Sequence, residues 1–262
     1  MLSSKFNYKI ILAWLLGVVL LLGMPSPALA FKVPIHEAIT REVFADFQVM
    51  AGGESFKFTD DAIDKIVKAN KDSDDISKQF NSEIHFDGED FPGGSERVMD
   101  LKEKVITKVT VEPVYPTSAR NNLGTALHTV QDFYAHSNWV ELGNSSINTN
   151  IGRQIFSGAD KDTPTCPNDP GTLGGEGLKQ LTSGYFILSD NFACGVPPEK
   201  CRHGVPIICP SGINKDDETR SGFSTARTLA VDTTEDFLNQ IFEDSRMKDN
   251  VEAIKHLMRI RS

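Results

Sequence analysis

Three side chains that can bind a metal ion occur at every fourth position near the middle of the chain: His128, Asp132 and His136. On an α-helix, residues four apart are rotated by only roughly 40°, so all three side chains leave the same face. Leu127 and Val130 point away from that face and are typical of a core. The spacing therefore predicts a helix with a polar cluster on one side and a hydrophobic core on the other.

This polar face can be interpreted in two ways. Imidazole nitrogens and carboxylate oxygens are ligands for a divalent ion such as Zn²⁺, and a helix holds them at fixed separations. The alternative is a hydrogen-bonded polar patch without a metal. We favour metal binding because a buried aspartate beside two histidines needs the polar partners that a metal supplies. One such helix can serve two neighbouring ions.

The first thirty residues have the features of a secretory signal peptide. Lys5 and Lys9 precede an apolar run over residues 10–22, and Ala28-Leu29-Ala30 provides the small residues of a cleavage site. An uncleaved membrane anchor is the alternative, but the run is shorter than the roughly 20 residues that span a bilayer. We expect residues 1–30 to be removed and residues 31–262 to form one secreted or periplasmic domain.

The balance of charge limits the partners of the chain. The formal net charge is −9, and removal of residues 1–30 takes away two lysines and no acid, which makes it −11. Such a protein has no general attraction for nucleic acid or anionic lipid. Binding to either must be local or depend on a metal.

All four cysteines, Cys166, Cys194, Cys201 and Cys209, lie in one stretch of the C-terminal half. In an oxidising compartment this predicts two disulfides that pin a loop-rich insert. A zinc knuckle is the alternative, but the spacings lack paired Cys-x2-Cys units. Three disulfide pairings remain open.

Hydrophobic periodicity predicts a mainly α-helical domain, because strand-like alternation is scarce. The central helix should begin at Thr117 or Ser118 and run to Trp139, which places Trp139 on the metal face. The other expected helices cover about 35–47, 59–70 with Thr59 as N-cap, 95–110 and 178–189, followed by one or two after 218. Residues 71–94 should be a long loop, and 143–218 an irregular insert.

Two further histidines lie in segments suited to metal binding. His36 follows the expected new N-terminus at Phe31, whose free amino group and carbonyl can chelate a metal after cleavage. His85 lies in the acidic segment after Asp74 and Asp75. We therefore expect the N-terminus and this segment to supply additional ligands.

The start of the mature chain, Phe31-Lys-Val-Pro-Ile-His36, resembles that of the single-strand-specific zinc nucleases and is similar in kind to the zinc-dependent phospholipases C. Members of that superfamily form helical bundles and bind zinc through the N-terminal amine, a nearby histidine, a loop aspartate and histidine, and a His-x3-Asp helix. The resemblance implies the following metal ligands: Phe31, His36, Asp75 (or Asp74), His85, His128, Asp132 and His136.

A second resemblance covers most of the mature chain. The segment LGTALHTVQDFYAHSNWVELG over residues 123–143, with HEAIT at 36–40, KCRHG at 200–204 and GINKD at 212–216, resembles the Het-C-like family. That family includes fungal heterokaryon-incompatibility Het-C and the N-terminal domain of von Willebrand factor A domain-containing protein 7. The match is most specific in the central helix.

The sequence departs from the trinuclear hydrolases at their outer site. Those enzymes use a further histidine and a carboxylate on a later helix, whereas the last helices here offer no histidine before His256. Only Glu141 or His203 could complete a site around His136. His203 is expected to be a loop residue near a disulfide, and His256 a solvated surface residue.

The fate of the aromatic residues beside the motif is open. Phe133, Tyr134 and Trp139 could line a substrate cleft by stacking on a base or packing on an acyl chain. Filling of the core is the more common role of such residues at helical spacing.

These features lead to one functional hypothesis and one alternative. The hypothesis is a metal-dependent hydrolase of phosphodiesters, either phospholipid or nucleic acid, with one to three zinc ions. Asp132 would bridge the metals and Asp75 would orient the attacking water. The alternative is a non-catalytic module, stabilised by metal and disulfides, that binds a partner or perturbs a membrane.

Overall fold

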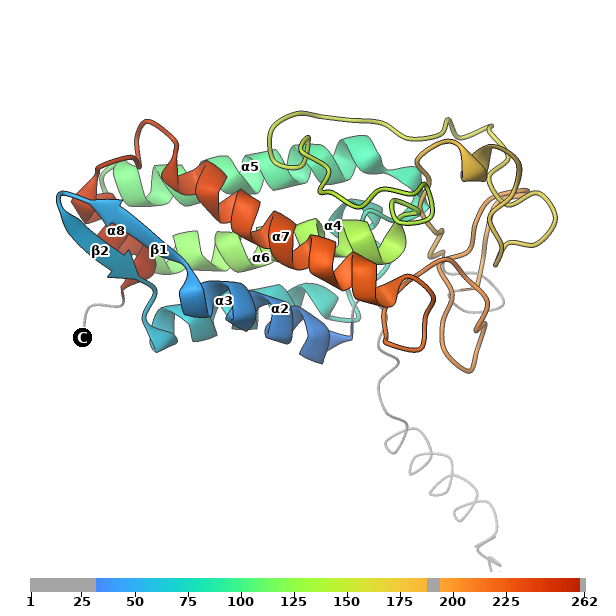
Figure 1. The fold of residues 1–262 in the computed structure, drawn as a ribbon, viewed down its shortest axis with the longest axis horizontal. Coiled ribbons are helices and arrows are strands. Elements are labelled where there is room, and N and C mark those ends of the chain that lie inside the picture. Colours follow the sequence, from blue (N-terminus) through green and yellow to red (C-terminus); the bar gives the residue numbers. More distant parts are fainter. Residues whose placement is uncertain (1–31, 188–193, 260–262) are drawn as a thin grey trace, which may run out of the picture.

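The computed structural model describes residues 32–187 and 194–259 and is mainly α-helical, as predicted. Figure 1 shows long helices that run side by side, with a small hairpin at one end and irregular loops at the other. The elements in chain order are α2 (Val33–Asp46), β1 (Gln48–Ala51), β2 (Glu54–Lys57), α3 (Asp60–Lys71), η1 (Asp72–Asp74), α4 (Ser82–His85), η2 (Asp87–Glu89), α5 (Phe91–Thr110), α6 (Pro116–His136), η3 (Gly175–Leu178), α7 (Phe223–Phe242) and α8 (Val251–Met258).

Helix α6 lies at the centre of the bundle, between α3, α5 and α7 (Figure 1). Every residue from Ala126 to His136 is buried. The helix approaches α3 closely at Gly124, where a Cβ atom would lie only 2.1 Å from the carbonyl oxygen of Ile66. Because neighbours cover α6 on all sides, its polar stripe lies inside the molecule together with its apolar side.

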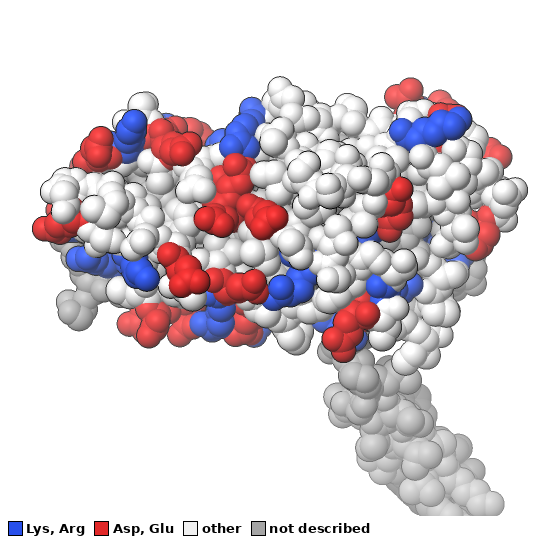
Figure 2. Space-filling view, in the orientation of Figure 1, with Lys and Arg blue, Asp and Glu red and all other residues white. Residues whose placement is uncertain are grey.

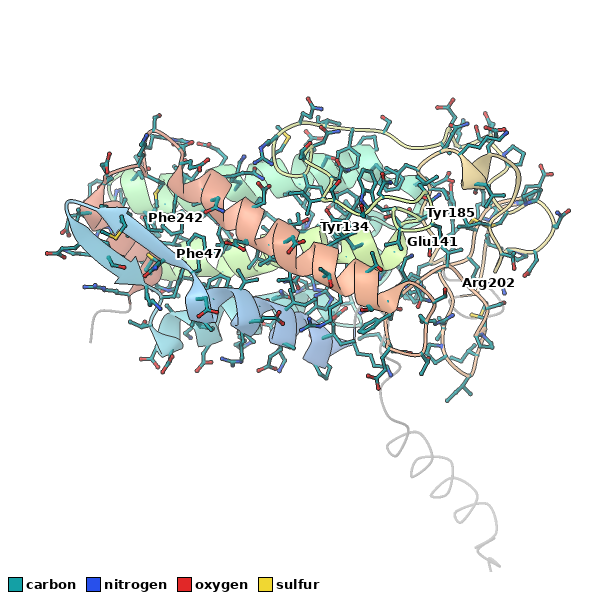
Figure 3. All side chains as sticks on the ribbon, viewed as in Figure 1. Phe47, Tyr134, Glu141, Tyr185, Arg202 and Phe242 are labelled. Atoms are coloured by element: carbon teal, nitrogen blue, oxygen red, sulfur yellow. A yellow bond between two sulfur atoms is a disulfide. The ribbon has the colours of Figure 1, made fainter. Side chains whose placement is uncertain are left out.

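The hydrophobic core fills the space around α6 and extends towards the hairpin. Phe133 and Tyr134 are fully buried in it, so they do not line a cleft. Phe47 and Phe242 pack together at the hairpin end, with ring centroids 5.6 Å apart (Figure 3). His256 is half-buried and not fully exposed as expected, and its Nδ1 lies 3.4 Å from the carbonyl oxygen of Val109.

Several element boundaries differ from the sequence prediction. Helix α6 ends at His136, since Ser137 is extended, so Trp139 does not continue the metal face. The predicted loop at 71–94 contains α4 and η2, and α5 begins at Phe91, where the Asp90 carboxylate accepts from the N–H of Gly93. The helix predicted at 178–189 is wrong over 179–187; the last two positions lie outside the described residues.

The antiparallel hairpin of β1 and β2 was not predicted either, because each strand has only four residues. The turn between them uses Gly52 and Gly53, both with positive φ, which glycine adopts without steric cost. The hairpin covers the end of the core farthest from the irregular loops (Figure 1).

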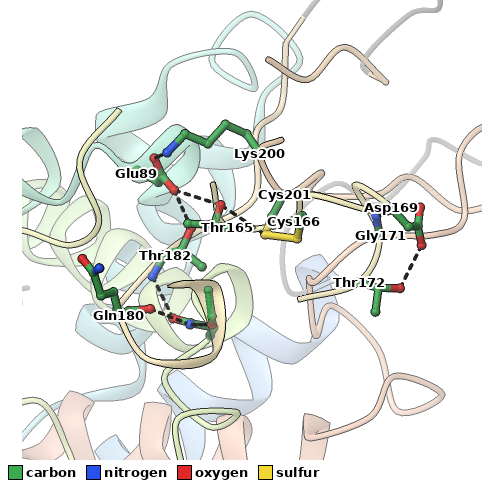
Figure 4. The surroundings of a disulfide bond; sticks show 12 residues. Glu89, Thr165, Cys166, Asp169, Gly171, Thr172, Gln180, Thr182, Lys200 and Cys201 are labelled. Atoms are coloured by element: carbon green, nitrogen blue, oxygen red, sulfur yellow. Dashed lines mark hydrogen bonds and ion pairs between the residues drawn. A yellow bond between two sulfur atoms is a disulfide. The ribbon is translucent and has the colours of Figure 1, made fainter. Parts of the chain in front are cut away.

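Two disulfides pin the irregular segment, as predicted, and they join Cys166 to Cys201 and Cys194 to Cys209. A buried ion pair ties this segment to η2, because Lys200 Nζ lies 2.6 Å from a carboxylate oxygen of Glu89. The other oxygen of Glu89 accepts a 2.6 Å hydrogen bond from the hydroxyl of Thr182 (Figure 4). No helix in the part of the chain that the structure describes is long and apolar enough to cross a membrane.

Candidate metal centre

Four histidines surround one buried carboxylate inside the bundle. Asp132 lies 2.8 Å from Nδ1 of His85 and 3.0 Å from Nε2 of His36 and of His128. The fourth, His136, has its Nε2 at 3.9 Å. Helix α6 supplies three of the five residues, α2 supplies His36, and α4 supplies His85. The structure therefore brings together five of the residues that the sequence predicted as ligands.

The cluster contains three groups of potential ligands, each with atoms within 4.8 Å of one another. His128 belongs to two groups, and Asp132 touches histidines of all three. The groups are therefore adjacent and share side chains, a layout that suits more than one ion. They consist of His36, His128 and Asp132; of Asp74, His85 and His128; and of Asp87, His136 and His203.

The surroundings of His136 differ from the sequence expectation. Its Nδ1 lies 3.1 Å from Asp87, and its Nε2 lies 3.3 Å from Asp216. His203 is fully buried against it, with ring centroids 4.4 Å apart. The partners of His136 thus come from η2 and from the disulfide-pinned loop, not from a late helix. Glu141 is not among them, because it pairs with Lys215 at 3.1 Å.

Asp87 and Asp216 were missed by the sequence analysis. Asp87 follows His85 by two residues, in a turn without periodicity. Asp216 ends the segment GINKD, one of the segments that carried the Het-C-like resemblance, and this was the only available signal. Their position next to His136 depends on tertiary structure, which spacing along the chain does not reveal.

Asp74 lies at the cluster and Asp75 does not. The Asp74 side chain is only 6% exposed, and its Oδ1 is 3.7 Å from Nε2 of His128. The Asp75 side chain is 63% exposed and lies 3.7 Å from Lys78 Nζ. The reason is local: Asp74 ends the turn η1, and the chain becomes extended at Asp75, which directs this side chain outwards.

Phe31 lies outside the described residues. Its neighbour Lys32 donates its backbone N–H to the carbonyl oxygen of Asp216 at 3.1 Å, so the described chain begins beside the cluster. Trp139 is turned away from the cluster, because its ring packs 5.6 Å from that of Phe133 and its N–H donates to the carbonyl of Ser146.

Two imidazoles form hydrogen bonds with polar side chains on the side away from Asp132. Nδ1 of His36 lies 2.7 Å from the amide oxygen of Gln131, and Nδ1 of His128 lies 3.2 Å from that of Asn70. The Gln131 amide nitrogen donates to Thr40 and Thr234, which orients this amide. An amide oxygen can only accept, so both Nδ1 atoms carry a proton and both Nε2 atoms face Asp132.

Electrostatic interactions within the cluster favour the ionised form of the central carboxylate, Asp132. Burial opposes ionisation of Asp132, but His128, His136 and His36 hold its pKa well below the usual range. Burial lowers the pKa of His128. Burial also acts against protonation of His136, yet Asp87 and Asp132 raise its pKa well above the ordinary value. In the same way, Asp132 outweighs burial and raises the pKa of His36.

The donor set fits divalent metal ions. Several buried ligand atoms have no hydrogen-bond partner among the described residues, and buried polar atoms are normally satisfied. Nitrogen and carboxylate oxygen are the donors that zinc prefers when thiolates are absent. The atoms concerned are Asp74 Oδ2, His85 Nε2, Asp87 Oδ1, Asp132 Oδ1, His136 Nε2, His203 Nε2 and both carboxylate oxygens of Asp216.

The fold and the cluster define a class of α-helical domain in which a central His-x3-Asp-x3-His helix lies beneath a disulfide-pinned loop. The family model described as the VWA7 N-terminal domain matches residues 39–250, and the chain belongs to this family, which confirms the predicted membership.

Similar proteins are much longer than this chain. Von Willebrand factor A domain-containing protein 7 of Rattus norvegicus is 35% identical over 190 residues, which cover 66% of the chain and 20% of that protein. The Mus musculus protein of that name is 33% identical over 83% of the chain and 25% of its own length, and the Homo sapiens protein is 33% identical over 80% and 24%. The chain thus spans about a fifth to a quarter of these relatives. No solved structure matches it significantly.

Proposed function

We propose that the domain is an exported, zinc-dependent hydrolase of phosphodiesters. The observation that carries the proposal is the set of three adjacent ligand groups, of which two share His128 and each contains a histidine close to Asp132. A structural zinc site needs one closed set of four ligands. Adjacent sites that share a carboxylate are typical of hydrolytic centres, in which neighbouring ions act together.

We assign the following roles to the residues of the cluster. His36, His85, His128 and Asp132 would hold the inner ions, while His136, His203, Asp87 and Asp216 would hold an outer one. When bound, zinc supplies a Lewis acid and lowers the pKa of a water molecule. In this proposal Asp74 replaces Asp75 as the residue that orients the attacking water, because Asp74 alone of the two lies at the cluster.

Asp132 would act mainly through its charge. Its depressed pKa keeps it anionic near neutrality, so it can offset the positive charge of two neighbouring ions at once. Gln131 and Asn70 would keep the Nε2 atoms of His36 and His128 directed at the ions.

Export is part of the proposal. Two disulfides are typical of proteins that fold in an oxidising compartment. Removal of residues 1–30 would leave Phe31 as the first residue, directly before Lys32, whose backbone N–H donates to Asp216 at the cluster. A free amine at this position would add one more ligand to the His36 group.

A second candidate function is a purely structural metal centre in a binding module. The observation in its favour is burial: His36, His85, His128, Asp132 and His136 are at most 1% exposed. Four surface hollows in the described part of the chain are lined by other side chains. A structural centre needs no access for substrate, whereas a hydrolase does.

Metal analysis combined with turnover separates the two candidates. The secreted protein, isolated after its natural processing, is analysed for zinc and assayed with bis(p-nitrophenyl) phosphate, phosphatidylcholine vesicles and single-stranded DNA. The hydrolase proposal requires two or three zinc ions and turnover that is lost in Asp132→Asn and retained in Asp75→Asn. Bound zinc without turnover on any of these substrates supports the structural centre, and a metal-free protein contradicts both.

A further inference from the structure

The disulfide-pinned loop carries a small apolar projection, residues 205–209, which we call the apolar tip. Val205 and Cys209 form its base, where each backbone N–H donates to the carbonyl oxygen of the other at 2.8 and 2.9 Å. Between them Ile207 is 95% exposed and Ile208 is 48% exposed. Ile207 is the most exposed large apolar side chain in the described ranges.

The backbone holds Ile207 outwards. The N–H of Ile208 donates to the carbonyl oxygen of Pro206 at 2.8 Å, and Ile207 between them has φ +71°. This is the rare form of γ-turn, which is strained for a β-branched residue and easy for glycine. An isoleucine here costs stability and gives nothing to the core. Such local strain at an exposed residue points to a role in binding.

The tip packs on a small apolar cluster that a disulfide holds in place. Phe186, Val205 and Cys209 form a small buried cluster, and Phe80 stacks on Phe186 at 5.2 Å. Phe186 also touches the ring of His203 at 5.2 Å, so the tip lies at the end of the molecule that holds the candidate metal centre. The disulfide from Cys209 to Cys194 fixes this arrangement.

The stretch of chain that forms the tip contains no acidic residues, unlike the chain as a whole. The chain has 36 acidic residues, yet none occurs between Lys200 and Lys215. Arg202 and Arg220 lie at the base of the tip, where they donate to Ser211 and to the carbonyl of Pro210. Neither arginine forms an ion pair among the described residues, although Asp169 lies close enough to Arg202 for an electrostatic interaction. Arg202 lies at the loop-built end of the molecule (Figure 3), where the view of Figure 2 shows separate acidic and basic side chains among uncharged ones.

We propose that the apolar tip inserts into the surface of an anionic phospholipid bilayer. Two aliphatic side chains on an uncharged projection can enter the acyl region, while unpaired arginines at its base face the headgroups. A protein partner is the less suitable occupant, because protein hot spots favour large aromatic side chains in a broad patch. The inference goes beyond the proposed hydrolase and does not require it.

Vesicle binding of the intact secreted protein tests this proposal without any turnover. Co-sedimentation is measured with vesicles of phosphatidylcholine alone and of an equimolar mixture with phosphatidylglycerol. The test variant is Ile207→Asn with Ile208→Ser, since asparagine tolerates positive φ. The control is Ile155→Ser, because Ile155 is 53% exposed outside the tip.

The proposal expects stronger binding to the mixed vesicles, weakened by salt, because the arginines act through screened charges. The tip variant should bind at least about tenfold more weakly, and the Ile155 variant within about twofold of the parent. Absence of binding by the parent chain overturns the proposal, as does equal binding by the tip variant. If light scattering shows an oligomer that the tip variant abolishes, the tip is an interface between copies and the proposal fails.

Discussion

Removal of bound metal should lower the thermal stability of this protein by an amount that the buried cluster allows us to estimate. Four ligand atoms have neither a hydrogen bond nor a short ion pair with any residue that the structure describes: Asp74 Oδ2, His85 Nε2 and, 3.7 Å apart, His203 Nε2 and Asp216 Oδ2. Each unsatisfied buried polar atom costs about 1–3 kcal/mol. The four together cost roughly 4–12 kcal/mol, which is comparable with the whole stability of a typical domain.

The expected change in melting temperature follows from this cost. A protein of this length loses about 2–4 °C per kcal/mol, so the lower bound of the cost corresponds to a fall of about 8 °C or more. The assay is thermal unfolding by circular dichroism, with and without a chelator, followed by addition of zinc. Zinc should restore the original melting temperature, because an ion that binds only the folded state stabilises it.

Two adjacent aspartates provide a matched control. Asp74→Asn should reduce the effect of the chelator, because it alters a buried ligand atom, whereas Asp75→Asn should leave the effect unchanged. A chelator-induced change below about 2 °C would refute the estimate, since it corresponds to less than about 1 kcal/mol. An equal response of the two variants would refute the assignment of Asp74.

Three further predictions follow from single contacts. Gln131→Leu removes the acceptor for Nδ1 of His36, so zinc affinity should fall about 10–100-fold in competition with a chromogenic chelator; unchanged affinity would contradict the orienting role. Asp236→Asn breaks a two-point ion pair with Arg153 and should cost roughly 1 kcal/mol near neutral pH. Burial opposes ionisation of Asp236, but Arg153 outweighs it and lowers the pKa of this carboxyl in the folded state. The stability that Asp236 contributes is therefore fully present above its unfolded pKa of about 3.9 and is lost as the pH falls through the lower pKa of the folded state. The difference in stability between the parent and Asp236→Asn, measured by urea unfolding, should shrink over this range, and a constant difference would exclude the linkage. Gly124→Ala should lower the free energy of unfolding by about 1–3 kcal/mol, because the new Cβ collides with the backbone of α3, and full stability would show that the helices can separate.

The central helix could be predicted because its information is local. Spacing by four placed His128, Asp132 and His136 on one face, and the structure places all three at one cluster. The end of this helix could not be predicted, since nothing in the sequence marks Ser137 as extended. The predicted helix was therefore too long, and it placed Trp139 on the metal-binding face, where this residue does not lie.

The ligands that were missed come from turns and loops. Asp87 and Asp216 have no periodic neighbours, so only tertiary contacts bring them to His136. The choice between Asp74 and Asp75 depends on a single turn, which shifts the direction of the side chain from one residue to the next. The disulfide pairing depends on the path of the loop, and spacing along the chain does not encode that path.

The ligand groups draw on segments from His36 to Asp216, with most of the helices between them. No short contiguous fragment therefore contains even one complete group together with the helix that supports it. Loss of α6 would remove a member of every ligand group, whereas a deletion confined to the loop that carries His203 and Asp216 would affect only the outer group.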